Sequence, residues 1–158
     1  MATKIKPVAK NLYEEDFYVW SGKQAELLRE RRFDELDLAN LIEDVEDLGG
    51  ALRRSARLHV MNILEHLLKL QHWPRSEQRL AWRGTVRRER SELTPSLRCD
   101  HADNFPEVYA PARHDAEGSL RDHGEQSAAD ALPRTCPYTL DQITSDWLPC
   151  DSCTTSRQ

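Results

Sequence analysis

The sequence predicts an all-α protein, a compact bundle of four to five helices with a short C-terminal helix. Three observations predict this class. Apolar residues recur at three-, four- and seven-residue spacings, as on one face of an amphipathic helix. Prolines divide the chain into helix-length segments, since Pro74, Pro95 and Pro149 each follow such a stretch. Charged residues make up 31% of the 158 residues, above the usual quarter, which long helices with charged outer faces would produce.

The first helix is expected from about Leu12 to Arg31. Asn11 followed by Glu14 matches a capping box, in which each side chain bonds a backbone N–H at the start of the helix. Gly22 in the interior predicts a bend or a close contact, because glycine costs about 1 kcal/mol relative to alanine there. The apolar face carries Tyr13, Phe17, Trp20, Leu27 and Leu28.

A second helix is expected after a short connection at Phe33-Asp34, with Asp34 or Asp37 as its cap. Its stripe of apolar residues predicts burial of Leu38, Leu41, Ile42, Val45 and Leu48. The pair Gly49-Gly50 follows, and two interpretations stay open. The glycines either end this helix in a turn or only kink a helix that continues.

The next segment carries an apolar face wide enough for the central helix of a bundle, and Pro74 ends it. This face consists of Leu52, Ala56, Val60, Ile63, Leu64, Leu67 and Leu68. A further helix is expected from about Ser76 to Leu93, where Thr94-Pro95 stops it. Its apolar side carries Leu80, Trp82, Val86 and Leu93.

The segment between residues 96 and 132 is expected to be irregular, because Pro106 and Pro111 interrupt helical periodicity. Only a short helix from about Pro111 to Arg121 is expected within it. Thr139 and Gln142 match a second capping box, which opens a short helix that packs Leu140, Ile143 and Trp147. The predicted organisation is one domain over residues 1–149, with a loose arm at 1–10, and a disordered tail at 150–158.

Charge is distributed unevenly along the chain. Acidic residues outnumber basic ones twelve to four over residues 12–47, basic residues lead ten to three over 50–90, and acids lead again after 91. This layout predicts that the basic middle packs between acidic neighbours. The net charge of −5 gives no global basic field of the kind that attracts nucleic acid.

The location expected from the sequence is the cytoplasm. The N-terminal run MATKIKPVAK lacks the apolar core of a signal peptide, and no apolar run approaches the roughly 20 residues needed to span a bilayer. We therefore expect no membrane association, and we expect all the thiols to be reduced. The four cysteines are Cys99, Cys136, Cys150 and Cys153.

Six segments together resemble one protein family in its own order along the chain. They are LYEEDFYVW at 12–20, LLRERRFDELDLANLIEDVEDLG at 27–49, HLLKLQHWP at 66–74, WRGTVRRER at 82–90, SLR at 96–98 and CPYTLDQITSDWLP at 136–149. The chain thereby resembles a bacterial family known as domain of unknown function 29. The resemblance implies a compact helical bundle and no established activity. It also implies a longer regular helix where this sequence places Pro106, Pro111, Gly118 and Gly124.

Carboxylates and histidines form one candidate site. Glu43 and Asp47 are four residues apart and His59 and His66 are seven apart, so each pair shares a helix face. If Gly49-Gly50 made a turn, these faces could meet, and Glu43, Asp47 and His66 could act as catalytic groups or bind a metal together with His59. The alternative is that the carboxylates pair with arginines or solvent, and that His66 is a half-buried structural histidine.

Two further patterns of side chains could form a binding site. Arg79, Arg83, Arg87 and Arg90 form a stripe that could contact an anionic partner, although we prefer the interpretation as a seam of ion pairs with neighbouring helices and a solvated face. Cys150 and Cys153 have the spacing of a zinc knuckle, but a zinc site needs two further ligands on a folded scaffold. We therefore expect no cofactor.

The function expected from these patterns is a small protein-interaction or regulatory module without catalytic activity. No nucleophile elbow, phosphate loop or dinucleotide fingerprint occurs in the sequence. The partner would be another protein, and the sequence leaves the oligomeric state open. The first alternative is a metal-dependent hydrolase that uses the carboxylate–histidine site. The second is nucleic-acid binding through the arginine stripe, which the acidic net charge disfavours.

Overall fold

The computed structural model describes residues 9–73, 76–93 and 105–149. These residues form helices, turns and loops and contain no strand, so the predicted all-α class is confirmed. The chain divides into two compact units, residues 1–50 and 51–158, which we call the first and the second unit. The predicted single domain over 1–149 stays a prediction. Its arm at 1–10 falls mostly outside the described residues, as does the tail at 150–158.

The first unit begins with α1 (Ala9–Glu15) and α2 (Phe17–Arg29), so the single helix predicted over residues 12–31 is wrong. Asp16 separates the two helices because its side chain accepts a hydrogen bond of 3.0 Å from the N–H of Val19 and caps α2. Asn11 and Glu14 lie inside α1 rather than at a helix start. The predicted close contact at Gly22 is also wrong, since no neighbouring atom lies within 4 Å of where its Cβ would be.

Trp20 forms the centre of this unit, with 2% of its surface exposed. The ring centroids of Tyr13 and Phe17 lie 4.8 and 5.5 Å from that of Trp20. The indole Nε1 of Trp20 donates to Asp37, which directly precedes α3 (Leu38–His72). The short helix η1 (Phe33–Glu35) occupies the connection between α2 and α3.

Helix α3 is unbroken over 35 residues and includes Gly49 and Gly50. The glycine pair therefore makes no turn, and the interpretation in which the helix ends there is wrong. Helix propagation is cooperative, so favourable residues on both sides carry the helix through two unfavourable ones. The acidic and the basic segments of the sequence belong to the same helix.

The apolar stripe predicted to be buried at the start of α3 is mostly exposed. Leu38, Ile42, Val45 and Leu48 have 56, 57, 67 and 61% of their surface accessible. Only Leu41 of the predicted stripe is half-buried. The periodicity identified the helix correctly, but the described residues leave most of its apolar stripe exposed.

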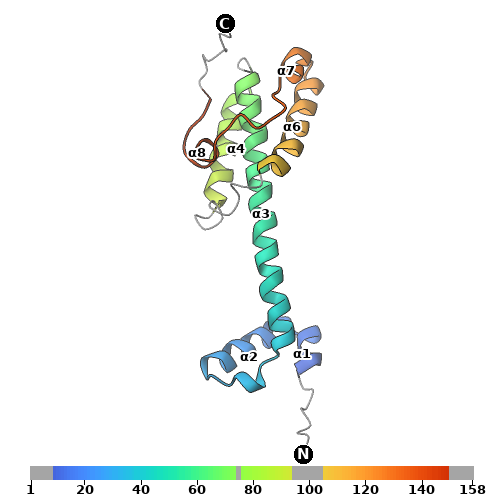
Figure 1. Ribbon diagram of the computed structural model, residues 1–158, viewed down its shortest axis with the longest axis vertical. Helices are drawn as coiled ribbons and strands as arrows, with labels where there is room; N and C mark the ends of the chain where they lie inside the picture. The colour runs from blue at the N-terminus through green and yellow to red at the C-terminus, as the bar shows by residue number, and fades with distance from the viewer. Residues whose placement is uncertain (1–8, 74–75, 94–104, 150–158) are drawn as a thin grey trace, which may run out of the picture. The chain divides into compact units, whose positions relative to one another are not determined.

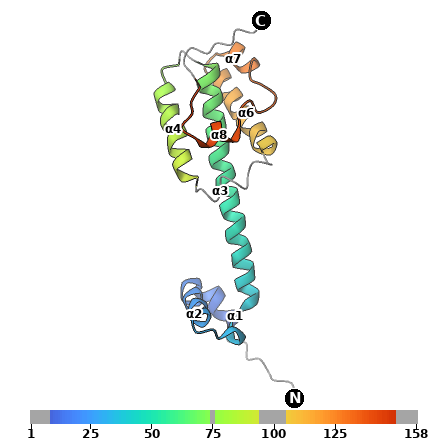
Figure 2. The ribbon, with the colours of Figure 1, turned by 60° about the vertical axis from the view of Figure 1, so that its left-hand side comes forward.

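The second unit is a helical bundle around the remainder of α3. Figure 1 and Figure 2 show α4 (Arg79–Glu92) and α6 (Phe105–Asp122) on either side of this part of α3. The shorter helices α7 (Gln126–Asp130) and α8 (Leu140–Thr144) complete the bundle. The prediction that this part of the chain supplies the central helix is confirmed by full or near-full burial of Ala56, Val60, Ile63, Leu64, Leu67 and Leu68. Leu52 of the same predicted face is instead 47% exposed.

The prediction of an irregular segment between residues 96 and 132 is wrong for α6, which is a regular helix with Pro111 inside it. Pro106 occupies the first turn, where a missing N–H costs nothing. Ala112, Ala116 and Leu120 are fully buried at four-residue spacing, and this packing offsets the hydrogen bond lost at Pro111. Residues 96–104 lie outside the described part of the chain.

The short C-terminal helix is confirmed together with its capping box. The Thr139 hydroxyl accepts from the N–H of Gln142 at 3.2 Å, and the Gln142 side chain accepts from the N–H of Thr139 at 3.0 Å. Helix α8 ends at Thr144 rather than at the predicted Trp147. In the described ranges no helix combines the length and the apolar character that crossing a membrane requires.

Candidate functional site

An exposed apolar stripe of the first unit lies on one side of α3 and is formed by Leu38, Ile42, Val45 and Gly49. We call it the α3 face. Its members follow one another at spacings of four, three and four residues, so they line up along the helix. Leu38, Ile42 and Val45 are 56, 57 and 67% exposed. This spacing is the one that packs a helix against another helix.

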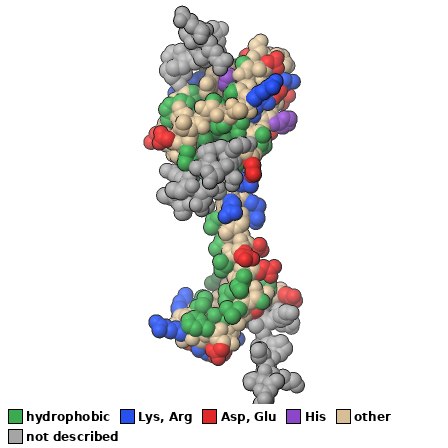
Figure 3. Space-filling model, viewed as in Figure 1, with side chains coloured by type: hydrophobic (Ala, Val, Ile, Leu, Met, Phe, Trp, Pro, Cys, Tyr) green, Lys and Arg blue, Asp and Glu red, His purple; other side chains and the backbone are tan. Residues whose placement is uncertain are grey.

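Further exposed apolar side chains lie in the first unit. Figure 3 shows hydrophobic side chains gathered at the surface over α2 and the beginning of α3. Phe17 and Phe33 are 54 and 58% exposed, although large aromatic side chains are usually buried. The α3 face is therefore accompanied by other apolar surface.

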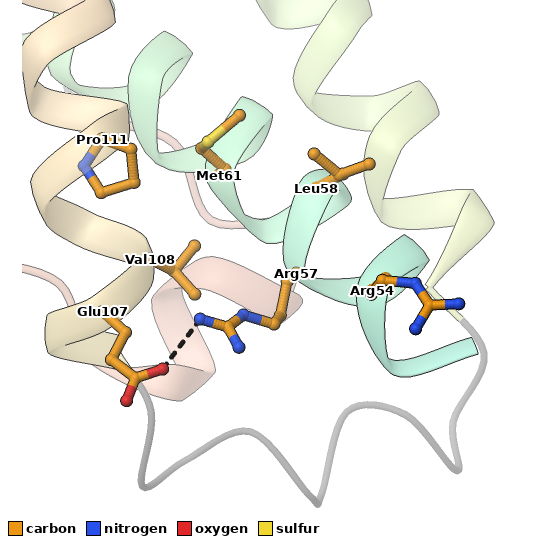
Figure 4. Close-up of a pocket in the computed structure, with 7 residues that line it drawn as sticks. All are labelled: Arg54, Arg57, Leu58, Met61, Glu107, Val108 and Pro111. Atoms are coloured by element: carbon orange, nitrogen blue, oxygen red, sulfur yellow. Dashed lines mark hydrogen bonds and ion pairs between the residues drawn. The ribbon is translucent and has the colours of Figure 1, made fainter. Parts of the chain in front are cut away.

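A shallow pocket lies between α3 and α6 in the second unit (Figure 4). Its volume is about 330 Å³, and its apolar wall comes from Leu58, Met61, Val108 and Pro111. Arg57 forms an ion pair with Glu107 at 2.8 Å, and Arg54 completes the lining. Such a pocket could hold one apolar side chain of a partner, with the Arg54 guanidinium beside it.

The predicted carboxylate–histidine residues lie in different units. Glu43 and Asp47 are exposed on α3 in the first unit. In the second unit, His59 Nδ1 lies 2.8 Å from Glu89, and His66 Nδ1 lies 2.8 Å from the carbonyl oxygen of Asn62. Over residues 9–73, 76–93 and 105–149, no three His, Cys, Asp or Glu side chains are grouped closely enough to hold a metal ion.

Sequence reasoning missed the polar group at Glu89, which is 8% exposed. Burial by itself would raise the pKa of Glu89, but hydrogen bonds from His59, Asn62 and Arg88 outweigh it and lower that pKa. Glu89 follows Val86 by three residues on α4, so helical periodicity could have placed it on the buried side. The hydrogen bonds of Glu89 with His59 and Asn62 connect α4 to α3.

His66 lies beside an ion pair between Lys69 and Glu65, with Nζ and Oε1 at 2.7 Å. Burial and the positive charge of Lys69 lower the pKa of His66, so the neutral imidazole is favoured. Neutral Nδ1–H can donate to the Asn62 carbonyl. These contacts match the interpretation of His66 as a half-buried structural histidine.

Two of the four stripe arginines hold the fold together. Arg79 donates to the backbone carbonyl of Leu70, and the buried Arg90 donates to the carbonyls of Gln142, Ile143 and Trp147. Arg83 and Arg87 line a second hollow of about 400 Å³ together with Arg90, and Asp146 contributes a carboxylate to it. The lining of this hollow is therefore not purely basic. The predicted anionic partner stays a prediction.

Of the cysteines, only Cys136 lies within the described residues, where it is free and half-buried. Burial raises the pKa of its thiol, which keeps it protonated. The knuckle pair Cys150 and Cys153 and the remaining Cys99 fall outside the described ranges.

Comparison with known proteins finds one family. The sequence model of a family described as domain of unknown function DUF29 matches residues 12–148. No curated protein and no solved structure matches the chain. The resemblance inferred from the sequence is therefore confirmed, and it carries no assigned activity.

Proposed function

The chain belongs to the family described as domain of unknown function DUF29, and we propose that it acts as a non-catalytic protein-interaction or regulatory module. The proposed binding surface is the α3 face. Its partner is another protein that covers this face with an apolar surface of its own. Binding would be non-covalent and reversible, without a chemical step.

The observation that carries the proposal is the exposure of the α3 face. Ile42 and Val45 are 57 and 67% exposed, although they belong to a regular apolar seam. Contiguous apolar surface on a soluble protein marks interaction sites, because water is released when a partner covers it. Full burial of a side chain of this size is worth about 1.5–3 kcal/mol.

Charges beside the α3 face supply selectivity. Glu43 and Glu46 are exposed on the same helix as the α3 face. A partner must therefore match an apolar seam that is accompanied by negative charge. Charge matching of this kind fixes the orientation of a partner and excludes others.

A cytoplasmic location is part of this proposal. Cys136 is a free, half-buried thiol, which suits a reducing compartment.

Photo-crosslinking in cells of the source organism tests the proposed function. A photoreactive phenylalanine analogue at Ile42 would lie on the α3 face, and the same analogue at Asp47 would lie on the opposite side of the helix. We expect discrete protein adducts from position 42 and none from position 47. Absence of adducts at position 42, or identical adducts at both positions, would contradict a binding role for this face.

A further inference from the structure

Ser55, His59 and Glu89 form a chain of polar contacts in the second unit that the proposed function does not use. Ser55 Oγ lies 3.4 Å from His59 Nε2, and His59 Nδ1 lies 2.8 Å from Glu89 Oε2. We propose that Ser55 is a nucleophilic serine that takes up one acyl group from an activated ester, with His59 as its base and Glu89 as the residue that positions the imidazole. This site is separate from the α3 face and independent of what binds there.

Two helices of the second unit bring these side chains together. Ser55, His59 and Asn62 follow one another on α3 at steps of four and three residues, so they share one side of the helix. Glu89 lies on the buried side of α4. The side chain of Glu89 is 11% exposed, that of His59 is 26% exposed, and Ser55 is exposed. A reagent can therefore reach the hydroxyl group, while the carboxylate that holds the imidazole is shielded from water.

Glu89 determines which imidazole nitrogen of His59 carries a hydrogen. Burial raises the pKa of Glu89, but hydrogen bonds from His59, Asn62 and Arg88 outweigh it and lower that pKa, so the carboxylate is ionised at neutral pH. An ionised carboxylate only accepts hydrogen bonds, and His59 Nδ1 must therefore be the donor. In the neutral imidazole, Nε2 then has a lone pair beside the Ser55 hydroxyl. A histidine held in this way can accept the proton of a serine that attacks a carbonyl carbon.

The acyl transfer balances without a cofactor. Ser55 Oγ forms a bond to the carbonyl carbon of the ester, and His59 Nε2 takes the proton of the hydroxyl group. The bond between that carbon and the leaving oxygen then breaks, and the imidazolium gives its proton to the leaving group. The products are an acyl ester of Ser55 and a free alcohol, and His59 is neutral again.

The position of Ser55 within a helix limits the site to a single acylation. Hydrolases that turn over stabilise the oxyanion with hydrogen-bond donors, often backbone N–H groups. Ser55 lies in the interior of α3 (Leu38–His72), where the backbone N–H groups already donate to carbonyls one turn earlier. We therefore expect slow acylation by an activated donor and slow release of the acyl group. A covalent mark on Ser55 is compatible with a module that has no catalytic turnover.

Acetylation of the purified full chain by p-nitrophenyl acetate tests the proposal. Peptide mass spectrometry measures the rate at each serine, and we expect Ser55 to react faster than Ser91. Ser91 is the matched reference within the same chain, because it is also exposed but its hydroxyl donates to the carbonyl of Arg88. His59→Gln should slow the acetylation of Ser55 about a hundredfold, since it removes the base, and should leave the rate at Ser91 unchanged. Circular dichroism checks that the variant keeps its helices.

The role of Glu89 has a readout of its own. Nitrogen-15 NMR of the imidazole should show the hydrogen of His59 on Nδ1 in the wild type. Glu89→Gln should lose this tautomer and acetylate Ser55 as slowly as His59→Gln, because an amide can also donate to the imidazole. Equal rates at Ser55 and Ser91 in the wild type, or a rate at Ser55 that His59→Gln leaves unchanged, would overturn the proposal. An unchanged tautomer in Glu89→Gln would overturn the positioning role of Glu89.

Discussion

The guanidinium group of Arg90 joins α4 to the segment that contains α8. Its Nε donates to the carbonyl of Ile143 at 2.8 Å, and its Nη2 donates to Gln142 and Trp147 at 2.7 and 2.9 Å. Gln142 and Ile143 lie at the C-terminal end of α8, where carbonyl groups lack helical partners and attract positive charge. Arg90 is 6% exposed, so these bonds are shielded from water.

Replacing Arg90 should destabilise the second unit. We expect Arg90→Ala to lower the free energy of unfolding by about 3 kcal/mol, because it leaves buried carbonyls without donors. Urea denaturation followed by circular dichroism measures the change. Arg87→Ala is the control, since Arg87 is an exposed arginine of the same helix and its loss should change stability by less than about 0.5 kcal/mol. Equal losses in both variants would contradict the role of Arg90.

His66 makes stability depend on pH. Its pKa is lower in the folded protein than in the unfolded chain, so the unfolded chain binds more protons as the pH falls below about 6.5. The stabilising contribution is fully present above about pH 6.5 and is lost as the pH falls toward the folded pKa. His72 acts in the same direction because burial also lowers its pKa.

The variant His66→Gln should therefore lose less stability than the wild type between pH 7.5 and 5.5, about the window set by the unfolded pKa. Thermal unfolding at several pH values measures this difference. His114→Gln changes an exposed imidazole and serves as the matched control. A pH dependence that is the same in His66→Gln as in the wild type would show that His66 is not responsible.

At the scale of single elements, α6 carries a proline that its helical structure does not require. Pro111 lies in the helix interior, is exposed and lines the pocket beside Leu58. Gly118 lies further along α6 and has no neighbour within 4 Å of a Cβ position. A Cβ at Gly118 would therefore disturb no neighbour among the described residues.

Pro111→Ala should stabilise the protein by about 1–3 kcal/mol, since it restores a helical hydrogen bond, less the gain in flexibility of the unfolded chain. Gly118→Ala in the same helix should stabilise by about 1 kcal/mol through helix propensity alone. Urea denaturation of both variants measures the change in the free energy of unfolding that each substitution causes. Destabilisation by Pro111→Ala would mean that the proline supports the local structure.

The elements also show what sequence reasoning can and cannot supply. The buried face from Ala56 to Leu68 was predictable, because dense apolar residues at helical spacing have only one stable environment, a core. Periodicity detects an amphipathic helix but does not identify what covers it, so burial of Leu38 and Val45 was wrongly expected. Pro111 suggested a break in α6 because local propensity carries no account of the tertiary packing of Ala112 and Ala116.

The candidate site was predictable to a smaller degree. Leu38, Ile42 and Val45 of the α3 face were identified from the sequence as part of an apolar stripe, whereas Gly49 was not. Their exposure was not predictable, since it depends on tertiary contacts that periodicity does not report. The contact of His59 with Glu89, at 2.8 Å, joins residues thirty positions apart and likewise required the structure.

At the scale of the whole molecule, the two units differ in the surroundings of their charged side chains. In the second unit, Arg57 of α3 forms an ion pair with Glu107 at 2.8 Å, and Arg90 of α4 donates to backbone carbonyls. The ion pair matches the prediction that basic segments pack against acidic neighbours. In the first unit, the acids of α3 lie beside exposed apolar residues. The exposed apolar side chains of the first unit include those of the α3 face.

The most direct test of the central claim measures whether the α3 face is open in the isolated chain and covered by another molecule in cells. Thiol labelling of Val45→Cys, located by peptide mass spectrometry, reports the accessibility of this position. Asp47→Cys on the opposite side of α3 is the control. We predict rapid labelling of both positions in dilute purified protein, and slow labelling of position 45 alone in cells. Slow labelling of position 45 in dilute protein, or equal labelling of both positions in cells, would contradict the account.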